Sequence, residues 1–473
     1  MAHNHHFTQE ELTERFVFTS KLKNYVFGLM GIGLVMVLVG AFLASSGDHG
    51  DGHHEDGHHG SVIEQTTEGN ITLVGDPEGG HGDAGHGDGH AEAGHGEGDH
   101  GGGHAHHHVT WYTPIIASFL HSNIYFLTLA MGAMFFIMVH RLTNAGWQTA
   151  IRRVPEAMWQ YLPVAVVGFG LILFLGSELY DWLALEEGAD RLIDEKRAYL
   201  NWPFWALRTA IFFGVWFFLG YRFRQLSIKQ DTEGGLDHFD KHLSLSAFFV
   251  IFFAITYCLF AVDWIKSLEP HWFSTIFGVY VFAGSMASAM TVIGLLLYFL
   301  QRQGYMSYIN DSHFHDVYKY VFGFSIFWGY IWLSQFLLIW YANIPEEGFY
   351  YVKRMRIGDP TYEGYAVWFY LNIFFCWAVP FFGLMTRNAK RNPKIFLWVS
   401  AGVLIGHFID LYQMIMPGAV RTNWQIGFVE VGFFILFAGI FLYFVLNALT
   451  KANLVPLKDP YTEESLHHST GAV

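Results

Sequence analysis

Ten apolar stretches, each about as long as a bilayer is thick, occupy most of this sequence of 473 residues. A helix needs about 20 apolar residues to cross the hydrocarbon layer, and unpaired backbone groups are too costly there for irregular structure. The sequence therefore predicts an all-α integral membrane protein with about ten transmembrane helices. The expected spans are residues 22–45, 113–140, 156–178, 203–223, 243–264, 273–300, 317–342, 364–386, 394–416 and 424–448.

The charges are few and unevenly distributed. Only 14% of the residues are charged, against about a quarter in soluble domains. Residues 48–108 hold thirteen acids and no Lys or Arg, so they account for all but −1 of the formal net charge of −14. Because no basic excess is available to neutralise phosphates, nucleic-acid binding is not expected.

Cysteine usage argues against a redox centre in this chain. Both cysteines, Cys258 and Cys376, lie in apolar stretches, and no CxxCH haem-attachment motif or four-cysteine cluster is present. We therefore expect no covalently bound cofactor. Any one-electron centre would have histidine ligands or would belong to a partner subunit.

The acidic segment 48–108 also contains eighteen glycines and fourteen histidines. Such a composition buries too little apolar surface to offset the entropy of ordering, so we predict a disordered tether. Many equivalent, glycine-spaced imidazoles could also bind metal loosely, which is the alternative. No firm metal site follows, because structural sites need a few ligands at fixed geometry.

Basic residues predict the orientation. The two termini and the loops on their side carry eighteen Lys and Arg, whereas the opposite loops carry eight. By the positive-inside rule both termini should be cytoplasmic, and the histidine-rich loop should face the periplasm or the exterior.

Ionisable residues within spans are costly and commonly functional. We expect nearly all of them in the half of the membrane that faces the histidine-rich loop. The hypothesis is an outward-opening proton path through Asp263, His407 and Asp410, with Glu178, Arg208 and Glu430 tuning it. Structural roles are the alternative. Glu178 and Asp263 would be solvated at the span ends, and His407 with Asp410 would make a satisfied helix contact. Arg208 would pair with Asp263 or Glu178, and His121 would be a packed histidine. His121 and Gln335 are the candidates for contacting a quinone, and Gln413 continues the face of His407 and Asp410.

An internal echo suggests how the spans are grouped. Asp263 to Pro270 and Asp410 to Pro417 both have the spacing D-x6-P, four spans apart. Spans 2–5 and 6–9 could therefore be parallel repeats, each with an aspartate at its outer end followed by a turn set by proline. The predicted segments are the cytoplasmic N-terminus and first span (1–47), the loop (48–110), a first four-helix bundle (111–271), a second (272–420), and the last span with a cytoplasmic tail (421–473).

Other functions remain open from the residues alone. An independent ion or metal transporter fed by the histidine-rich loop would also use repeats and buried carboxyl groups. Such transporters usually have helices broken by glycine or proline near the middle of the membrane, and here only Pro163 and Pro380 lie well inside spans. A haem site would need two histidines at one depth, which only His121 and His407 could supply.

Four stretches resemble one family. "YLNWPFW" (199–205), "EPHWFST" (269–275), "LIWYANIPEE" (338–347) and "GHFIDLYQMIMPG" (406–418) are similar to segments of the ActF subunit of bacterial alternative complex III. That subunit falls in the wider NrfD, or polysulfide-reductase membrane-subunit, group. The resemblance runs from about Phe16 to Ser465 and does not include the histidine-rich loop.

The resemblance implies a fold, a function and partners. It implies a core of two four-helix bundles and a subunit of a menaquinol:cytochrome c oxidoreductase, with another periplasmic carrier as a possible acceptor. The chain would be a scaffold with a second quinone site or a proton path. It would have no redox centres of its own and would not be catalytic in isolation. Menaquinone is the implied ligand. The implied location is the inner membrane of a bacterium, with both termini cytoplasmic and the histidine-rich loop periplasmic. The partners would be the NrfD-like ActC, an iron–sulfur subunit, c-type cytochrome subunits carrying haem c, a terminal oxidase, and lipid.

Overall fold

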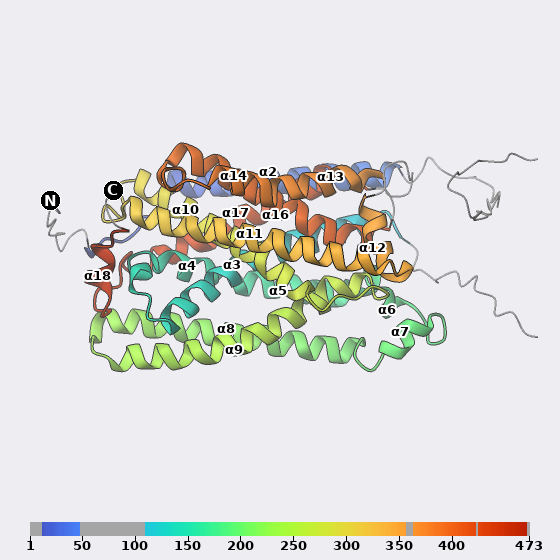
Figure 1. Ribbon diagram of the computed structural model, residues 1–473, viewed down its shortest axis with the longest axis horizontal. Coiled ribbons are helices and arrows are strands. Elements are labelled where there is room, and N and C mark those ends of the chain that lie inside the picture. The colour runs from blue at the N-terminus through green and yellow to red at the C-terminus, as the bar shows by residue number, and fades with distance from the viewer. Residues whose placement is uncertain (1–11, 48–108, 356–362, 422–423, 471–473) are drawn as a thin grey trace, which may run out of the picture.

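The computed structural model describes residues 12–47, 109–355, 363–421 and 424–470, and the part of the chain that it describes is helical without strands. Ten of these helices are long and apolar enough to cross a membrane, which confirms the predicted all-α, multi-pass architecture. The helices run along the long axis of the molecule (Figure 1). The predicted tether at 48–108 lies outside the described residues.

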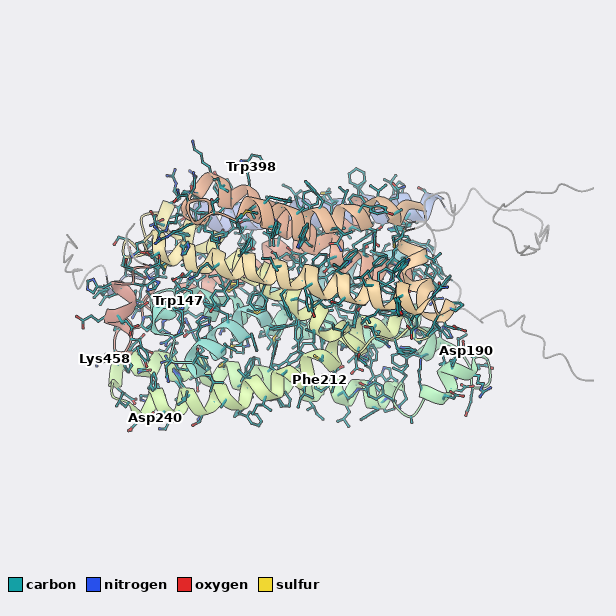
Figure 2. The ribbon with its side chains drawn as sticks, in the orientation of Figure 1. Trp147, Asp190, Phe212, Asp240, Trp398 and Lys458 are labelled. Carbon is teal, nitrogen blue, oxygen red and sulfur yellow. The ribbon has the colours of Figure 1, made fainter. Side chains whose placement is uncertain are left out.

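The two ends of the helix array differ. The described chain termini lie together with α18 (Thr462–Leu466) at one end, here called the terminal end (Figure 1). The short helices α7 (Arg191–Lys196) and α12 (Pro345–Met355) lie at the opposite end, here called the loop end. Lys458 marks the first and Asp190 the second (Figure 2). That the terminal end is cytoplasmic stays a prediction.

Spans two to five pack as a first bundle. Its helices are α3 (Thr113–Leu142), the broken third span α4, η2, α5 and η3 (Arg153–Met158, Trp159–Tyr161, Leu162–Leu175, Gly176–Glu178), α8 (Trp202–Glu233) and α9 (Asp237–Trp264). Helix α3 contacts α4, α5 and α9, and α8 packs along α9. Asn201 caps the start of α8 by accepting a hydrogen bond from the backbone N–H of Phe204.

Spans six to nine pack as a second bundle. Its helices are α10 (Phe277–Arg302), α11 (Asp311–Ala342), the interrupted eighth span α13, η5 and α14 (Glu363–Ile373, Phe374–Ala378, Val379–Gly383) and α16 (Pro393–Ala419). Helix α10 contacts α11 and α16, and α13 packs on α16. Asn310 and Asn392 cap α11 and α16 in the same way as Asn201 caps α8.

The central helices of the two bundles, α3 and α10, pack directly on each other. They approach closely because Gly132 has no side chain: a Cβ there would lie 2.7 Å from the Cβ of Ala289. Helix α3 also contacts α16 of the second bundle, and α10 contacts α9 of the first. This reciprocal arrangement agrees with the predicted pair of four-helix units.

The two aspartates of the repeated D-x6-P spacing lie at different distances from the ends of their helices. Asp263 is the last residue but one of α9, whereas α16 continues for nine residues after Asp410 and includes Pro417. At 1.5 Å per residue, Asp410 is about 12 Å further than Asp263 from the end of its own α-helix. The prediction of an end-of-helix aspartate followed by a proline turn is therefore wrong for Asp410, which lies deeper.

The first and last spans form a pair beside the bundles. Helices α2 (Ser20–Gly47) and α17 (Phe428–Leu449) meet along a glycine seam, and α17 also packs on α3 and α4. A Cβ on Gly432 would lie 2.8 Å from the backbone nitrogen of Val37 and 3.0 Å from the carbonyl oxygen of Gly33. Small residues at such contacts let transmembrane helices approach closely.

Candidate functional site

Asp410 lies inside the second bundle, where three uncharged donors from three helices surround it. Its side chain is 1% exposed. The indole Nε1 of Trp328 donates to Oδ2 at 3.0 Å, and the amide of Asn372 donates to Oδ1 at 2.8 Å. The hydroxyl of Tyr280 also donates to Oδ1. The carboxyl group is thus held in place without a cationic hydrogen-bond partner among the described residues.

Asn372 reaches Asp410 from a span that contains a π turn. Pro380 has no N–H to bond to the carbonyl of Cys376, and its ring would clash with that carbonyl in a regular helix. The chain accommodates this by a π turn over residues 374–378, a feature that is often found at functional sites. The thiol of Cys376 donates to Asn372 Oδ1 at 3.1 Å, which fixes the amide with its nitrogen toward Asp410.

His407 lies one turn before Asp410 on the same helix face. Its Nε2 is 3.0 Å from the hydroxyl of Thr128 on α3, and its Nδ1 has no hydrogen-bond partner among the described residues. A Cβ on Gly284 would lie 3.2 Å from His407 Nδ1 and 3.4 Å from Asp410 Oδ2. The glycine therefore leaves a small gap that both polar atoms face.

A small cavity extends from Asp410 toward the loop end. It has a volume of about 20 Å³, which is room for about one water molecule. Its polar lining includes Tyr280, Gln335, Tyr350, Tyr351, Arg354, Asn372, Asp410 and Gln413. Gln335 accepts a hydrogen bond at 3.0 Å from Ser274, a partly exposed residue at the loop end. Asp410, Gln335 and Gln413, which were singled out separately from the sequence, thus border one cavity.

An ion pair closes the loop end of this cavity. Arg354 on α12 donates to Glu269 Oε2 at 2.5 Å and to the carbonyl of Gln413 at 2.7 Å, and Lys353 is 3.3 Å from Glu269 Oε1. Burial alone would raise the pKa of Glu269. The charges of Arg354 and Lys353 outweigh that effect, so the pKa lies below its usual value.

Asp263 forms a separate site in the first bundle. Its carboxylate pairs with Arg208 through two hydrogen bonds of 2.8 and 3.0 Å, and the hydroxyl of Tyr199 donates to it at 2.8 Å. The guanidinium also lies over the Tyr199 ring, 3.8 Å from its centroid. Of the two roles weighed for Arg208, the structure has it as the partner of Asp263. Among the described residues, no hydrogen bond joins Asp263 to His407 or Asp410.

The remaining predicted residues have local roles. Glu430 forms the capping box at the start of α17, where it accepts from the N–H of Gly427 at 2.8 Å and from Trp424 Nε1 at 2.7 Å. His121 Nε2 lies 2.9 Å from the carbonyl of Phe408, as expected of a packed histidine. Glu178 is partly exposed at the end of the third span.

A buried charged network at the terminal end was not anticipated. Asp459, in the C-terminal segment, pairs with Arg141 and with Arg152, the latter at 2.6 Å. Burial alone would raise the pKa of Asp459, but the two guanidinium groups lower it well below its usual value. Glu156 is bound in the same network, with Arg153 at 3.0 Å. The sequence pattern does not reveal this network, because Arg141 and Arg152 lie about 300 residues before Asp459 in the chain.

Comparison with known proteins adds no identification. No family model matches the chain, and no curated protein matches it. Within the described residues, no group of three or more His, Cys, Asp and Glu side chains is arranged to hold a metal ion.

Proposed function

We propose that the chain is an integral membrane subunit of a menaquinol:cytochrome c oxidoreductase of the alternative complex III type, in a bacterial inner membrane. Its role is to scaffold the complex and to conduct protons between Asp410 and the loop end. Menaquinol oxidation releases two electrons and two protons. The electrons pass to iron–sulfur and c-type haem centres in partner subunits, and this chain carries none of them.

The location of the four resembling stretches supports this proposal. Although they are dispersed in sequence, three of them contribute residues to the polar sites of the loop end, and the fourth, 338–347, joins α11 to α12 at that end. Tyr199 donates to Asp263, and Glu269 pairs with Arg354. The stretch 406–418 contains Asp410 itself. Because the same residues carry the family resemblance and form polar sites, we infer that they have a role in function and not only in packing.

The setting of Asp410 is the observation that carries the proposal. A charged carboxylate inside a bilayer is costly unless it is paired, and the three partners of Asp410 are all uncharged. Such a group is suited to exchanging a proton. Because the adjoining cavity has room for about one water molecule, a proton can pass from Asp410 toward Gln335 and Ser274 at the loop end.

Asp263 has a different part in this proposal. Its bidentate contact with Arg208 keeps both charges satisfied, so the pair braces α8 against α9. Glu430 similarly fixes the start of α17. The proposed path therefore depends on Asp410 and His407, with the other carboxyl groups holding the helices around it.

Purification under mild detergent tests the assignment to a complex. We expect the chain to elute with subunits that show the absorption of c-type haem and the electron paramagnetic resonance of iron–sulfur clusters. If the chain is instead stable alone and carries zinc into vesicles, the transporter alternative replaces this proposal.

Turnover of the complex tests the proposed path. Asp410→Asn should lower quinol-driven proton release and cytochrome c reduction, whereas Asp240→Asn is the matched control because Asp240 is exposed at the terminal end. Wild-type proton release and turnover in Asp410→Asn would remove Asp410 from the path.

A further inference from the structure

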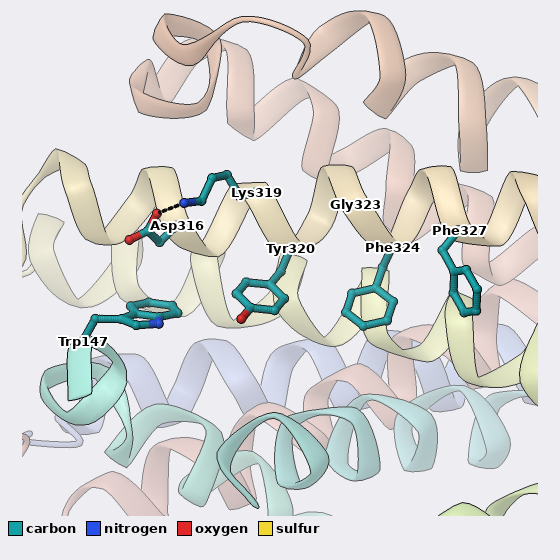
Figure 3. Close-up of a pocket in the computed structure, with 7 residues that line it drawn as sticks. All are labelled: Trp147, Asp316, Lys319, Tyr320, Gly323, Phe324 and Phe327. Atoms are coloured by element: carbon teal, nitrogen blue, oxygen red, sulfur yellow. Dashed lines mark ion pairs between the residues drawn. The ribbon is translucent and has the colours of Figure 1, made fainter. Parts of the chain in front are cut away.

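A second polar–apolar site lies far from the Asp410 cavity, in the terminal half of the molecule. A groove of about 500 Å³ runs along α11, a volume within the range of small-molecule sites. It lies where the two bundles meet, because Trp147 comes from η1 (Gly146–Ile151), which follows α3, whereas the other residues of its lining come from α11. Figure 3 shows these side chains.

Aromatic rings form the wall of this groove. Tyr320, Phe324 and Phe327 are spaced four and three residues apart, so they share one face of α11 and lie in a row (Figure 3). Trp147 extends the row, with its ring stacked toward Tyr320 at a centroid distance of 6.2 Å. The row covers roughly 14–24 Å from the start of the helix, that is, from near the membrane surface toward its middle.

Gly323 opens the groove to lipid. It is exposed between Tyr320 and Phe324, and a Cβ at this position would meet no atom within 4 Å. A larger residue here would therefore fill the groove without displacing its neighbours. This gives a way to block the site alone.

The end of the groove nearest the membrane surface is polar, and the charges of Asp316 and Lys319 there are paired with each other. The carboxylate of Asp316 pairs with the half-exposed Lys319 at 2.6 Å, and it also lies 2.5 Å from His468 Nε2. Tyr320 contributes its hydroxyl, which is 2.8 Å from His140 Nε2. His140 Nδ1 donates to a backbone carbonyl, so Nε2 accepts from Tyr320.

These groups fit an uncharged head that has both hydrogen-bond donors and acceptors. The hydroxyl oxygen of Tyr320 keeps its lone pairs for a ligand O–H, and the Lys319 ammonium keeps two N–H donors for a carbonyl oxygen. A phosphate would meet the Asp316 carboxylate beside Lys319, which disfavours an anionic lipid. A planar ring would lie against Trp147 and Tyr320.

We propose that this groove binds a membrane quinone, with the head between Trp147, Lys319 and Tyr320 and the isoprenoid tail along Phe324 and Phe327. The site takes either redox form, because the quinone presents carbonyl acceptors and the quinol presents hydroxyl donors. It is a binding site only, without electron transfer at this position. The inference rests on the proposed function in assuming that quinone is available to the chain.

Photolabelling of the purified full chain in nanodiscs tests the site. The probe is a naphthoquinone with two isoprene units and an aryl azide, and cross-linked peptides are mapped by mass spectrometry. We expect labels around Trp147 and residues 319–327. Gly323→Phe should lower labelling there at least tenfold. Gly31→Phe, at an equally open and exposed glycine of α2, should leave it unchanged. Tyr320→Phe should weaken competition by unlabelled naphthoquinol about fivefold, as expected for one lost hydrogen bond, and should leave labelling by the oxidised probe unchanged, because the Tyr320 oxygen offers lone pairs to a ligand O–H only.

Competition separates quinone from lipid. Unlabelled naphthoquinone should displace the probe, and phosphatidylglycerol at the same concentration should not. Labelling that is unaffected by Gly323→Phe, or that only phosphatidylglycerol displaces, would overturn the proposal. Because the assay needs neither partner subunits nor turnover, an unlabelled groove refutes this site alone, and the absence of co-purifying haem refutes the proposed function alone.

Discussion

Replacing each buried aspartate by asparagine should separate the two carboxyl sites energetically. Asp410 accepts from Tyr280 and Asn372 on one oxygen and from Trp328 on the other. In Asp410→Asn, the NH₂ group of the new amide faces an N–H donor in either orientation, from Trp328 or from Asn372. One donor is then left without an acceptor in a buried site, which costs about 1–3 kcal/mol.

The same substitution at Asp263 should cost more. It leaves the guanidinium of Arg208, which is 6% exposed, without a counter-charge. Removing one partner of a buried ion pair costs about 3–5 kcal/mol. We therefore expect Asp263→Asn to destabilise the protein more than Asp410→Asn, with the exposed Asp240→Asn near zero.

Equilibrium unfolding of the purified chain in mixed micelles, followed by far-UV circular dichroism, measures this order. The comparison is internal, so it does not depend on the absolute stability in detergent. Equal losses for Asp410→Asn and Asp263→Asn would refute the reasoning, because they would mean that Asp410 also balances a buried cation. A negligible loss for Asp410→Asn would mean that its three donors are satisfied by water instead.

Three further outcomes follow from other contacts. Gly284→Ala should place a methyl group in the gap faced by His407 and Asp410 and lower proton release by the complex. Its unfolding free energy should stay within about 1 kcal/mol of the wild type, the size of the helix propensity gain, with Gly31→Ala as the control that leaves proton release intact. Gly33→Leu should overpack the contact of α2 with α17 and cost about 1–3 kcal/mol in unfolding free energy, whereas Gly31→Leu, in open space, should not. The lowered pKa of Glu269 stabilises the fold fully above about pH 4.5, its value in the unfolded chain, and this stabilisation is lost as the pH falls through the lower native value. Glu269→Gln should therefore flatten the acid limb of a stability–pH curve, and an unchanged limb would contradict the ion pair.

Sequence predicted the framework because length and hydrophobicity decide it. A run of about 20 apolar residues can satisfy its backbone in lipid only as a helix, so all ten spans were identified to within a few residues at most ends. The breaks were harder to anticipate. Pro380 inside the eighth span predicts an interruption there, but it does not by itself say that the chain takes the form of a π turn rather than a kink.

The candidate site was predicted only in part, because a search for charges finds charged residues alone. It found Asp410 and His407, and it offered Arg208 as a partner of Asp263. It missed the uncharged donors Tyr280 and Asn372, which distinguish the Asp410 site from a salt bridge. It also missed the terminal network, because the pairing of Arg141 and Arg152 with Asp459 of the C-terminal segment is a property of the folded chain.

The pairing of α2 with α17 has a consequence for biogenesis. The first of the ten spans has its main helical neighbour in the last of them, so it must reside in lipid without that neighbour until the last span has been synthesised. Among the ten spans it has the highest mean hydropathy and the smallest buried share, so it can reside in lipid before its neighbour is made. Truncation before residue 428 should therefore leave an inserted but unanchored first helix, which membrane quality-control proteases would recognise.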